Sequence, residues 1–233
     1  MSADYSGRNV VVTGATGELG EAVARLLLQA GAMVHVPARD PDKALGLYGG
    51  YGGRVRVAKV SDLGDEAEVA AFYAAVPPLW ASIHCAGGFS MSPAERTSLA
   101  DFRGMFDVNA VPAFLCCREA VRSMAGRGGR IVNVAAQPGV EPRRGAGMVA
   151  YAASKSAVAA ITLALAEEVA NDGIWVNAVV PSIMDTKANR RAMPAADHAK
   201  WPKLDEVAAT IAFLASPGNA VTRAALVPVY GRG

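Results

Sequence analysis

The feature that most constrains the fold of this chain is a regular alternation between short, β-branched apolar runs and longer segments in which apolar residues recur every three or four positions. Strands that are apolar on both faces, each followed by a helix, are typical of a parallel sheet covered by helices on both sides. At 233 residues the chain has the length of one large α/β domain. The sequence therefore predicts a single doubly wound α/β domain over residues 1–233, with a seven-stranded parallel sheet and helices on both faces. The expected strands span 9–13, 33–36, 55–58, 80–86, 130–135, 175–180 and 225–230, the expected helices span 21–30, 66–76, 109–125, 151–171 and 204–216, and residues 46–54 are expected to form a helix-to-strand loop.

Composition excludes several classes of function. The net charge is only +2 and the charged residues are interspersed, so no basic stripe is available to neutralise the phosphates of a nucleic acid. No uninterrupted apolar stretch reaches about 18 residues, and the first residues lack the basic start and apolar segment of an export signal. The three cysteines and three histidines are scattered without the spacing of metal ligands. We therefore expect a cytoplasmic protein that acts on a small-molecule substrate and binds no nucleic acid, membrane or metal.

A glycine-rich turn follows the first expected strand. The run TGATGELG, residues 13–20, places glycines at 14, 17 and 20 directly before an amphipathic helix. Glycines permit a tight turn and a close approach of the backbone to a pyrophosphate, and the helix N-terminus presents free N–H groups and the positive end of its dipole. Because this turn lies between a strand and a helix of an alternating α/β chain, it predicts a dinucleotide-binding site.

The end of the second expected strand bears on the choice between NAD and NADP. A carboxylate there would hydrogen-bond the ribose 2′-hydroxyl, whereas an arginine would favour a 2′-phosphate. The chain reads HVPARD, which puts Arg39 just past the strand and Asp40 after it. NADP(H) is therefore favoured. NAD(H) stays an alternative, because Asp40 could reach the ribose or Arg39 could simply be solvated.

Four further motifs follow the glycine turn in a fixed order: HCAG at 84–87, Asn109 within DVNA, YAASK at 151–155 and VNAVVPSIMDT at 176–186. Together they resemble the short-chain dehydrogenase/reductase family over nearly the whole chain. The resemblance implies a Rossmann domain and a homodimer or homotetramer. It also implies that Tyr151 is the acid/base, that Lys155 lowers its pKa and contacts the nicotinamide ribose, and that Asn109 supports a water-mediated proton relay.

The residues support these roles independently. Positions i and i+4 share one face of a helix, so the Lys155 ammonium is expected to lie near the Tyr151 phenol and to lower its pKa. Asn109 could instead cap the helix that follows it, and the two roles are compatible.

The resemblance also assigns cofactor contacts. It places Asp62 at the adenine amine, Ala86 and Gly87 at the adenine ribose, and the segment from Pro181 to Thr186 over the nicotinamide. The full set of expected cofactor-binding residues is Gly14, Thr16, Gly17, Leu19, Gly20, Arg39, Asp62, Leu63, Ala86, Gly87, Lys155, Pro181, Ile183 and Thr186.

Three positions depart from the family pattern. Glu18 stands where the glycine loop usually has Gly, and His84 replaces the first Asn of the usual NNAG. Ala136 stands where a Ser would hydrogen-bond a substrate carbonyl. Losing such a donor commonly costs a hundredfold or more in rate when the substrate oxygen needs it. A simple ketone or secondary alcohol is therefore a less natural substrate.

A second resemblance points the same way. The runs HCAGGFS, GMVAYAASK and DTKANRRAMPAADHAKW, with the alanine-rich strand end, are similar to dihydropteridine reductase-like members of the family, which also lack the Ser. The resemblance implies hydride transfer to a quinonoid, conjugated ring with Tyr as proton donor. Those members carry an Asp at the end of the second strand, which this chain does not, so the cofactor preference is expected to differ.

The sequence thus predicts an NADP(H)-favouring oxidoreductase that transfers hydride to a conjugated acceptor, such as a quinonoid dihydropterin, a quinone or an activated carbonyl. One alternative is an ordinary ketone or alcohol dehydrogenase in which water, Gln137 or a backbone N–H replaces the missing Ser. Another is a non-catalytic dinucleotide sensor or scaffold, which the presence of Tyr151, Lys155 and Asn109 disfavours. The long connection at about 181–205 is expected to act as a lid, and the expected substrate-binding residues are Ala136, Gln137, Met148, Met193 and Trp201.

Overall fold

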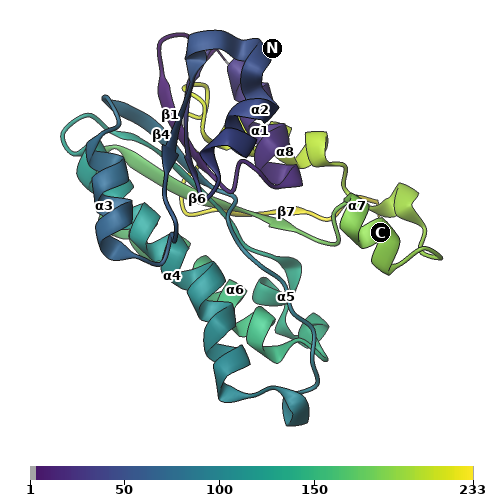
Figure 1. Cartoon of the computed structure of the whole chain (residues 1–233). Helices are drawn as coiled ribbons and strands as arrows, with labels where there is room; N and C mark the ends of the chain where they lie inside the picture. Colours follow the sequence, from purple (N-terminus) through teal and green to yellow (C-terminus); the bar gives the residue numbers. More distant parts are fainter. Residues whose placement is uncertain (1–3, 233) are drawn as a thin grey trace.

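The computed structural model describes residues 4–232. All seven strands lie in one parallel sheet with the order β3-β2-β1-β4-β5-β6-β7 (Figure 1). The predicted seven-stranded, doubly wound sheet is confirmed. The strands are β1 (Asn9–Thr13), β2 (Met33–Ala38), β3 (Val55–Lys59), β4 (Leu79–His84), β5 (Gly129–Val134), β6 (Ile174–Pro181) and β7 (Leu226–Val229), and the helices are α1 (Glu18–Gln29), α2 (Pro41–Tyr48), α3 (Glu66–Ala74), α4 (Leu99–Met124), α5 (Gln137–Val140), α6 (Val149–Glu168), α7 (Lys187–Ala192) and α8 (Leu204–Leu214).

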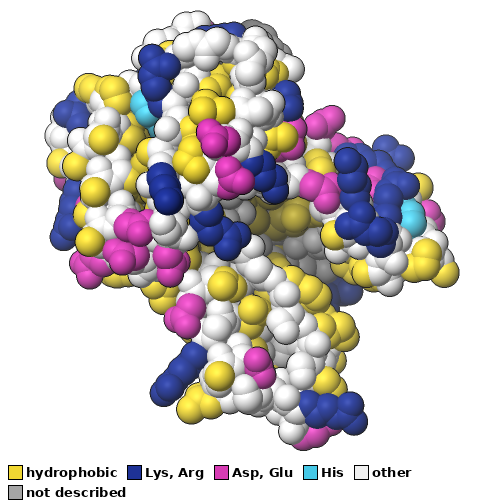
Figure 2. Space-filling view, in the orientation of Figure 1, with side chains coloured by type: hydrophobic (Ala, Val, Ile, Leu, Met, Phe, Trp, Pro, Cys, Tyr) yellow, Lys and Arg dark blue, Asp and Glu magenta, His cyan; other side chains and the backbone are white. Residues whose placement is uncertain are grey.

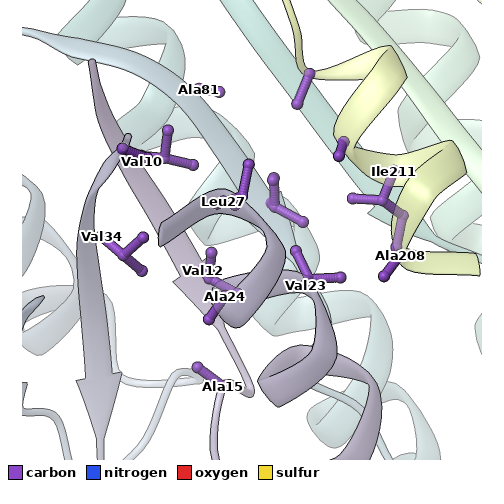
Figure 3. Packing of buried hydrophobic residues seen from close by; sticks show 14 of the residues in the cluster. Val10, Val12, Ala15, Val23, Ala24, Leu27, Val34, Ala81, Ala208 and Ile211 are labelled. Atoms are coloured by element: carbon purple, nitrogen blue, oxygen red, sulfur yellow. The ribbon is translucent and has the colours of Figure 1, made fainter. Parts of the chain in front are cut away.

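Each face of the sheet is buried under its own set of helices. Val10 and Val12 of β1 pack in the cluster that contains α1 and α8, whereas Val11 packs in the cluster that contains α3 and α4. Figure 3 shows Val23 and Leu27 of α1 lying between the sheet and Ile211 of α8. Apolar side chains on both faces of one strand therefore explain the near-continuous apolar runs in the sequence.

Hydrogen bonds from the N-terminal segment and from β4 also hold the last helix. The Tyr5 hydroxyl donates to the backbone oxygen of Ala212, and the Trp80 indole donates to that of Ala215 at 2.9 Å. Both acceptors lie at the C-terminal end of α8, so residues more than 130 positions apart close one side of the core.

The helix boundaries differ from those expected at several points. Helix α4 begins at Leu99, ten residues before the expected start, because Ser98 and Asp101 form a capping box. Asn109 therefore lies inside α4, and the interpretation of Asn109 as a helix cap is wrong. Helix α2 was not expected; Asp40 caps it and Pro41 occupies its first position, so part of the expected loop at 46–54 is helical.

Helix α6 is long and apolar enough to cross a membrane by length and composition alone. In the fold it packs against α4 and β6, and Lys155, Val158, Thr162 and Ala166 are buried on its inner face.

Candidate active site

The glycine turn connects the end of β1 to the first turn of α1 and leaves no room for a side chain at Gly14 or Gly20. Gly14 has a φ of +67°, and a Cβ added to it would lie 2.6 Å from the backbone nitrogen of Ala86. A Cβ at Gly20 would lie 2.2 Å from the Gly14 oxygen. Thr16 and Gly17 are exposed at the tip of the turn, and Gly17 caps α1. The turn therefore presents bare backbone and a helix N-terminus at the carboxyl end of the sheet, which fits a pyrophosphate.

Two side chains beside this turn are engaged elsewhere. Leu19 is buried in the core, so only its backbone is available to the cofactor. Glu18 reaches across to the loop after β6, where its Oε2 accepts a hydrogen bond of 3.1 Å from the Lys187 backbone nitrogen, at the start of α7. The residue that replaces the family glycine thus links the glycine turn to the expected lid.

The end of β2 leaves Arg39 exposed and Asp40 occupied. Ala38 is buried at the end of the strand, and Arg39 follows it at the surface. The Asp40 carboxylate accepts a hydrogen bond of 3.0 Å from the Lys43 backbone nitrogen and so caps α2. The side chain that was expected to compete for the ribose is committed to a helix terminus.

The expected adenine-side residues follow β3, next to β2 in the sheet. Asp62 is exposed, and its Oδ1 accepts a hydrogen bond of 2.8 Å from the Gly64 backbone nitrogen. Leu63 is half-buried and packs against the apolar cluster under α3. The order β3-β2-β1-β4 thus brings Asp62, Arg39 and the glycine turn to one edge of the sheet.

Asn109, Lys155 and the turn after β4 meet at the centre of the site. The Asn109 side chain accepts from the Gly88 nitrogen at 3.0 Å and donates to the Gly88 oxygen and to Ser154 Oγ, both at 3.1 Å. A Cβ at Gly87 would lie 2.7 Å from Asn109 Oδ1 and 3.3 Å from Lys155 Nζ. Asn109 therefore fixes the loop after β4, and only glycine fits at position 87.

Lys155 is only 6% exposed, and its Nζ donates a hydrogen bond of 2.8 Å to the Val134 oxygen at the end of β5. Burial lowers the pKa of Lys155 to about 8, which leaves it charged at neutral pH. Burial raises the pKa of Tyr151 to about 12. The expected lowering of the Tyr151 pKa by Lys155 is therefore wrong for this structure, because the cost of burying a phenolate dominates.

Tyr151 has an aromatic neighbour from the loop after β4. Its ring packs edge-on against Phe89, with ring centroids 4.9 Å apart and an interplanar angle of 79°. Phe89 itself is 62% exposed. The phenol is protonated at neutral pH, which is the form that a proton donor needs.

The end of β5 offers no hydroxyl. Ala135 and Ala136 are 2% and 5% exposed, and Ala136 precedes the single turn of α5. This turn packs closely against α6. Ser156 Oγ donates to the Gly139 oxygen at 2.7 Å, and a Cβ added at Gly139 would lie 2.7 Å from the Lys155 carbonyl carbon. The wall beside the first turns of α6 is therefore backbone and alanine.

His84 is part of a buried hydrogen-bond network rather than a ligand site. Asn133 Nδ2 donates to Thr162 at 2.9 Å, so Asn133 Oδ1 is the acceptor that faces His84 Nδ1 at 2.8 Å. His84 Nε2 then accepts from the Ser82 hydroxyl at 2.8 Å, and Ser82 accepts from Tyr73 at 2.7 Å. Burial lowers the pKa of His84 to about 4, in keeping with this neutral tautomer. The network ties α3, β4, β5 and α6 together behind the site.

The loop after β6 is held at both of its ends. The Asp185 nitrogen donates to the Pro202 oxygen at 3.0 Å, and the Asp185 carboxylate, whose pKa is lowered by these partners, pairs with Arg190 and with Lys203. Thr186 caps α7 by accepting from the Asn189 nitrogen at 3.0 Å. Figure 2 shows Lys and Arg side chains gathered on the lobe that contains α7, beside a hollow that separates it from the body below.

A cavity of about 380 Å³ lies between this loop and the end of β5. Of the expected substrate residues, Gln137 and Trp201 line it, whereas Ala136, Met148 and Met193 are not among its described lining residues. Ile183, expected at the cofactor, also lines it. Sequence reasoning missed its other polar walls. They are Glu141, Arg144, Ser182, Asp197, Lys200 and Tyr230. Ser182 and Tyr230, which directly follow β6 and β7, carried a signal, because ligands bind at strand ends.

Within residues 4–232 no group of three or more His, Cys, Asp or Glu side chains is arranged to hold a metal ion. The three cysteines, Cys85, Cys116 and Cys117, are free thiols.

Comparison with known proteins decides the family. Residues 8–197 match the family model described as short chain dehydrogenase. This chain belongs to the short-chain dehydrogenase family. Galactitol 2-dehydrogenase from Rhizobium johnstonii is 36% identical to it, over 96% of this chain and 93% of that protein. A 3-oxoacyl-acyl-carrier-protein reductase from Rickettsia bellii is 33% identical, over 91% of each.

A solved structure from Beutenbergia cavernae, titled as an NAD(P)-dependent gluconate 5-dehydrogenase with bound NADP, is 29% identical to this short-chain dehydrogenase. It covers 99% of this chain and 98% of its own, with a TM-score of 0.88. Membership of the family makes the chain an NAD(P)-dependent oxidoreductase.

Proposed function

We propose that this short-chain dehydrogenase favours NADP(H) and reduces a conjugated acceptor, such as a quinonoid dihydropterin, a quinone or an activated carbonyl, with Tyr151 as the proton donor. The observation that carries the proposal is the pairing of a half-buried, protonated Tyr151 with a strand end, Ala135 and Ala136, that has no hydroxyl.

The dinucleotide supplies the hydride when it is bound. In the direction of reduction Tyr151 needs to hold a proton, and its raised pKa of about 12 ensures that it does at neutral pH. In a conjugated acceptor the charge that develops on reduction is spread over the ring system. A second hydrogen-bond donor at position 136 therefore matters less for such an acceptor than for a simple ketone.

Lys155 and Asn109 also contribute to this chemistry. Lys155 is charged at neutral pH and is held by the Val134 oxygen, which favours a role in binding the nicotinamide ribose and in passing a proton to Tyr151. Every polar atom of the Asn109 side chain is engaged by Gly88 or Ser154. We therefore assign Asn109 a positioning role in the relay: it holds the loop after β4 in place.

The preference for NADP(H) rests on the end of β2. Arg39 is exposed there and is free to meet a 2′-phosphate, whereas the Asp40 carboxylate is used to cap α2. Asp62, Leu63, Ala86, Gly87, Pro181, Ile183 and Thr186 are proposed to complete the cofactor site, at the same edge of the sheet.

A second candidate is an ordinary polyol or ketone dehydrogenase. The name of the galactitol 2-dehydrogenase relative and the polar lining of the cavity favour it. In that case Gln137, a water or a backbone N–H takes the place of the missing Ser.

The test is a matrix of NADH and NADPH against a quinonoid dihydropterin, a quinone and a ketone, measured for the wild type, Tyr151→Phe and Ala136→Ser. We expect the best turnover with NADPH and a conjugated acceptor, a loss of at least about a hundredfold in Tyr151→Phe, and little gain in Ala136→Ser with that acceptor. Robust ketone turnover by the wild type that Ala136→Ser does not improve would contradict our interpretation of Ala136. Tight NADPH binding without any turnover would favour a sensor or scaffold instead.

We also propose a cytoplasmic homodimer or homotetramer. Val108 and Phe114 of α4 and Val149 and Leu163 of α6 are large apolar side chains that remain exposed. Sedimentation of the wild type against Phe114→Glu tests whether this face joins two copies, and a monomeric wild type would exclude it.

A further inference from the structure

The cavity beside the catalytic wall contains a carboxylate that the chemistry described above does not use. Glu141 directly follows α5, four residues after Gln137; its side chain is 41% exposed, and it lines the cavity of about 380 Å³. Because Gln137 directly follows Ala136, this carboxylate lies on the continuation of the wall that faces the reacting end of a substrate.

Three protein groups hold Glu141 in one orientation. The Tyr230 hydroxyl donates to Oε1 at 2.7 Å, and Gln137 Nε2 and Arg144 Nε donate to Oε2 at 3.1 and 2.9 Å. These bonds, with that of Tyr230 the strongest, lower the pKa of Glu141, so the carboxylate is ionised at neutral pH. A carboxylate accepts about four hydrogen bonds. The protein supplies three, two to Oε2 and one to Oε1, so Oε1 can accept a further hydrogen bond.

The charges on the cavity walls cancel. Glu141 and Asp197 balance Arg144 and Lys200, and Trp201 adds an aromatic surface. The cavity therefore has no excess charge with which to attract an ion, and the fixed carboxylate would repel an acid group placed beside it.

We propose that Glu141, oriented by Tyr230, is a specificity-determining residue that accepts a hydrogen bond from an N–H or O–H group at the end of a neutral acceptor remote from its reacting centre. This inference rests on the proposed function, since it takes the acceptor to be one that Tyr151 protonates. The guanidine-like edge of a pterin and the hydroxylated tail of a ketose both carry such a donor. A plain naphthoquinone does not, and a keto acid carries a carboxylate instead.

The kinetic test compares wild type, Glu141→Gln and Tyr230→Phe with NADPH and four acceptors: a quinonoid dihydropterin, a neutral ketose, a naphthoquinone and a keto acid. Glu167→Gln is the matched control, because Glu167 is an exposed carboxylate of α6 that pairs with Arg223. Glu141→Gln turns the acceptor at one oxygen into a donor that opposes Gln137 and Arg144. We expect the KM for the donor-bearing acceptors to rise about tenfold with kcat nearly unchanged, which is the effect of one lost hydrogen bond to a charged group.

The control acceptors and the Tyr230→Phe variant test whether the effect depends on the Glu141 carboxylate. With Glu141→Gln the KM for naphthoquinone should stay constant and that for the keto acid should fall. Tyr230→Phe should act in the same direction as Glu141→Gln but less strongly, since the carboxylate remains and only its orientation is lost. An equal loss for all four acceptors would mean that Glu141 is merely structural and would overturn the inference.

A binding arm separates this inference from the proposed function. Calorimetric titration of the NADP⁺-loaded protein with an oxidised pterin or with galactitol measures the same contact without turnover. If no acceptor is reduced but Glu141→Gln weakens binding of either probe about tenfold, the proposed function fails and the role of Glu141 stands. Unchanged Kd values in Glu141→Gln, or no saturable binding of either probe to the wild type, would overturn it.

Discussion

Replacing Lys155 with Met should stabilise this protein at neutral pH. Lys155 is only 6% exposed, and burial lowers its pKa from 10.5 to about 8. Each step of one in pKa corresponds to about 1.4 kcal/mol, so holding the charge inside the fold costs about 3 kcal/mol at pH 7. Met removes this cost but leaves the Val134 oxygen without its partner, a loss of about 1–2 kcal/mol. We therefore expect Lys155→Met to raise the free energy of unfolding by about 1–2 kcal/mol at pH 7.

The sign of this effect should reverse with pH. Between pH 8 and 10.5 the unfolded chain holds a proton on Lys155 that the folded chain has lost, so the stability of the wild type rises with pH in this window. By pH 10 most of the cost has gone, and Lys155→Met should then be the less stable protein. Urea unfolding at pH 7 and pH 10, at matched protein concentration and without dinucleotide, measures both differences.

Lys43→Met is the control, since Lys43 is an exposed lysine of α2, and we expect it to differ from wild type by less than about 0.5 kcal/mol at both pH values. A Lys155→Met difference that is the same at pH 7 and pH 10 would refute the reasoning, because it would show that the charge of Lys155 is not what costs stability.

Three further predictions follow from the site. For reduction, kcat/KM should be flat below pH 7.5 and should fall as pH rises through about 8, because Lys155 loses its charge while Tyr151 keeps its proton; a rate that climbs through pH 8 would exclude this. Asn133→Ala should lower the free energy of unfolding by about 2–4 kcal/mol, because it strands the His84 N–H in the core, and urea unfolding beside the exposed control Asn171→Ala measures this. Glu18→Ala should speed tryptic cleavage within α7 by a factor of about 3–10, because the helix loses its bond to the glycine turn; equal cleavage rates in the variant and wild type would mean that the bond does not restrain the loop.

The central strands β1, β2, β5 and β6 could be predicted from the sequence because they are runs rich in β-branched residues that are buried on both faces. The edge strands β3 and β7 are more exposed. Helix starts were harder to place. Ser98 and Asp101 form a capping box that is visible in the sequence, yet the apolar period becomes regular only near Asn109. The start at Leu99 was therefore missed. The cap at Asp40 was missed because the same residue was considered as a ligand of the ribose.

Within the site, spacing predicts which side chains share a face but not what each of them contacts. Tyr151 and Lys155 lie one helical turn apart, as expected. However, the Lys155 ammonium donates to the Val134 oxygen, and burial is the main influence on the pKa of the Tyr151 phenol. The cavity was beyond prediction for another reason. Glu141 and Tyr230 are 89 positions apart, and only the ordering of β5, β6 and β7 in the sheet brings them together.

The packing of α1 against α8 has a consequence for the synthesis of this protein. Val23 and Leu27 of α1 are covered by α8, which the ribosome adds about 175 residues later. At roughly 5–20 residues per second, this apolar face stays open for roughly ten to forty seconds on every nascent chain. The bond from Tyr5 to the Ala212 oxygen forms only after that interval. The first helix to be made is thus among the last to be buried.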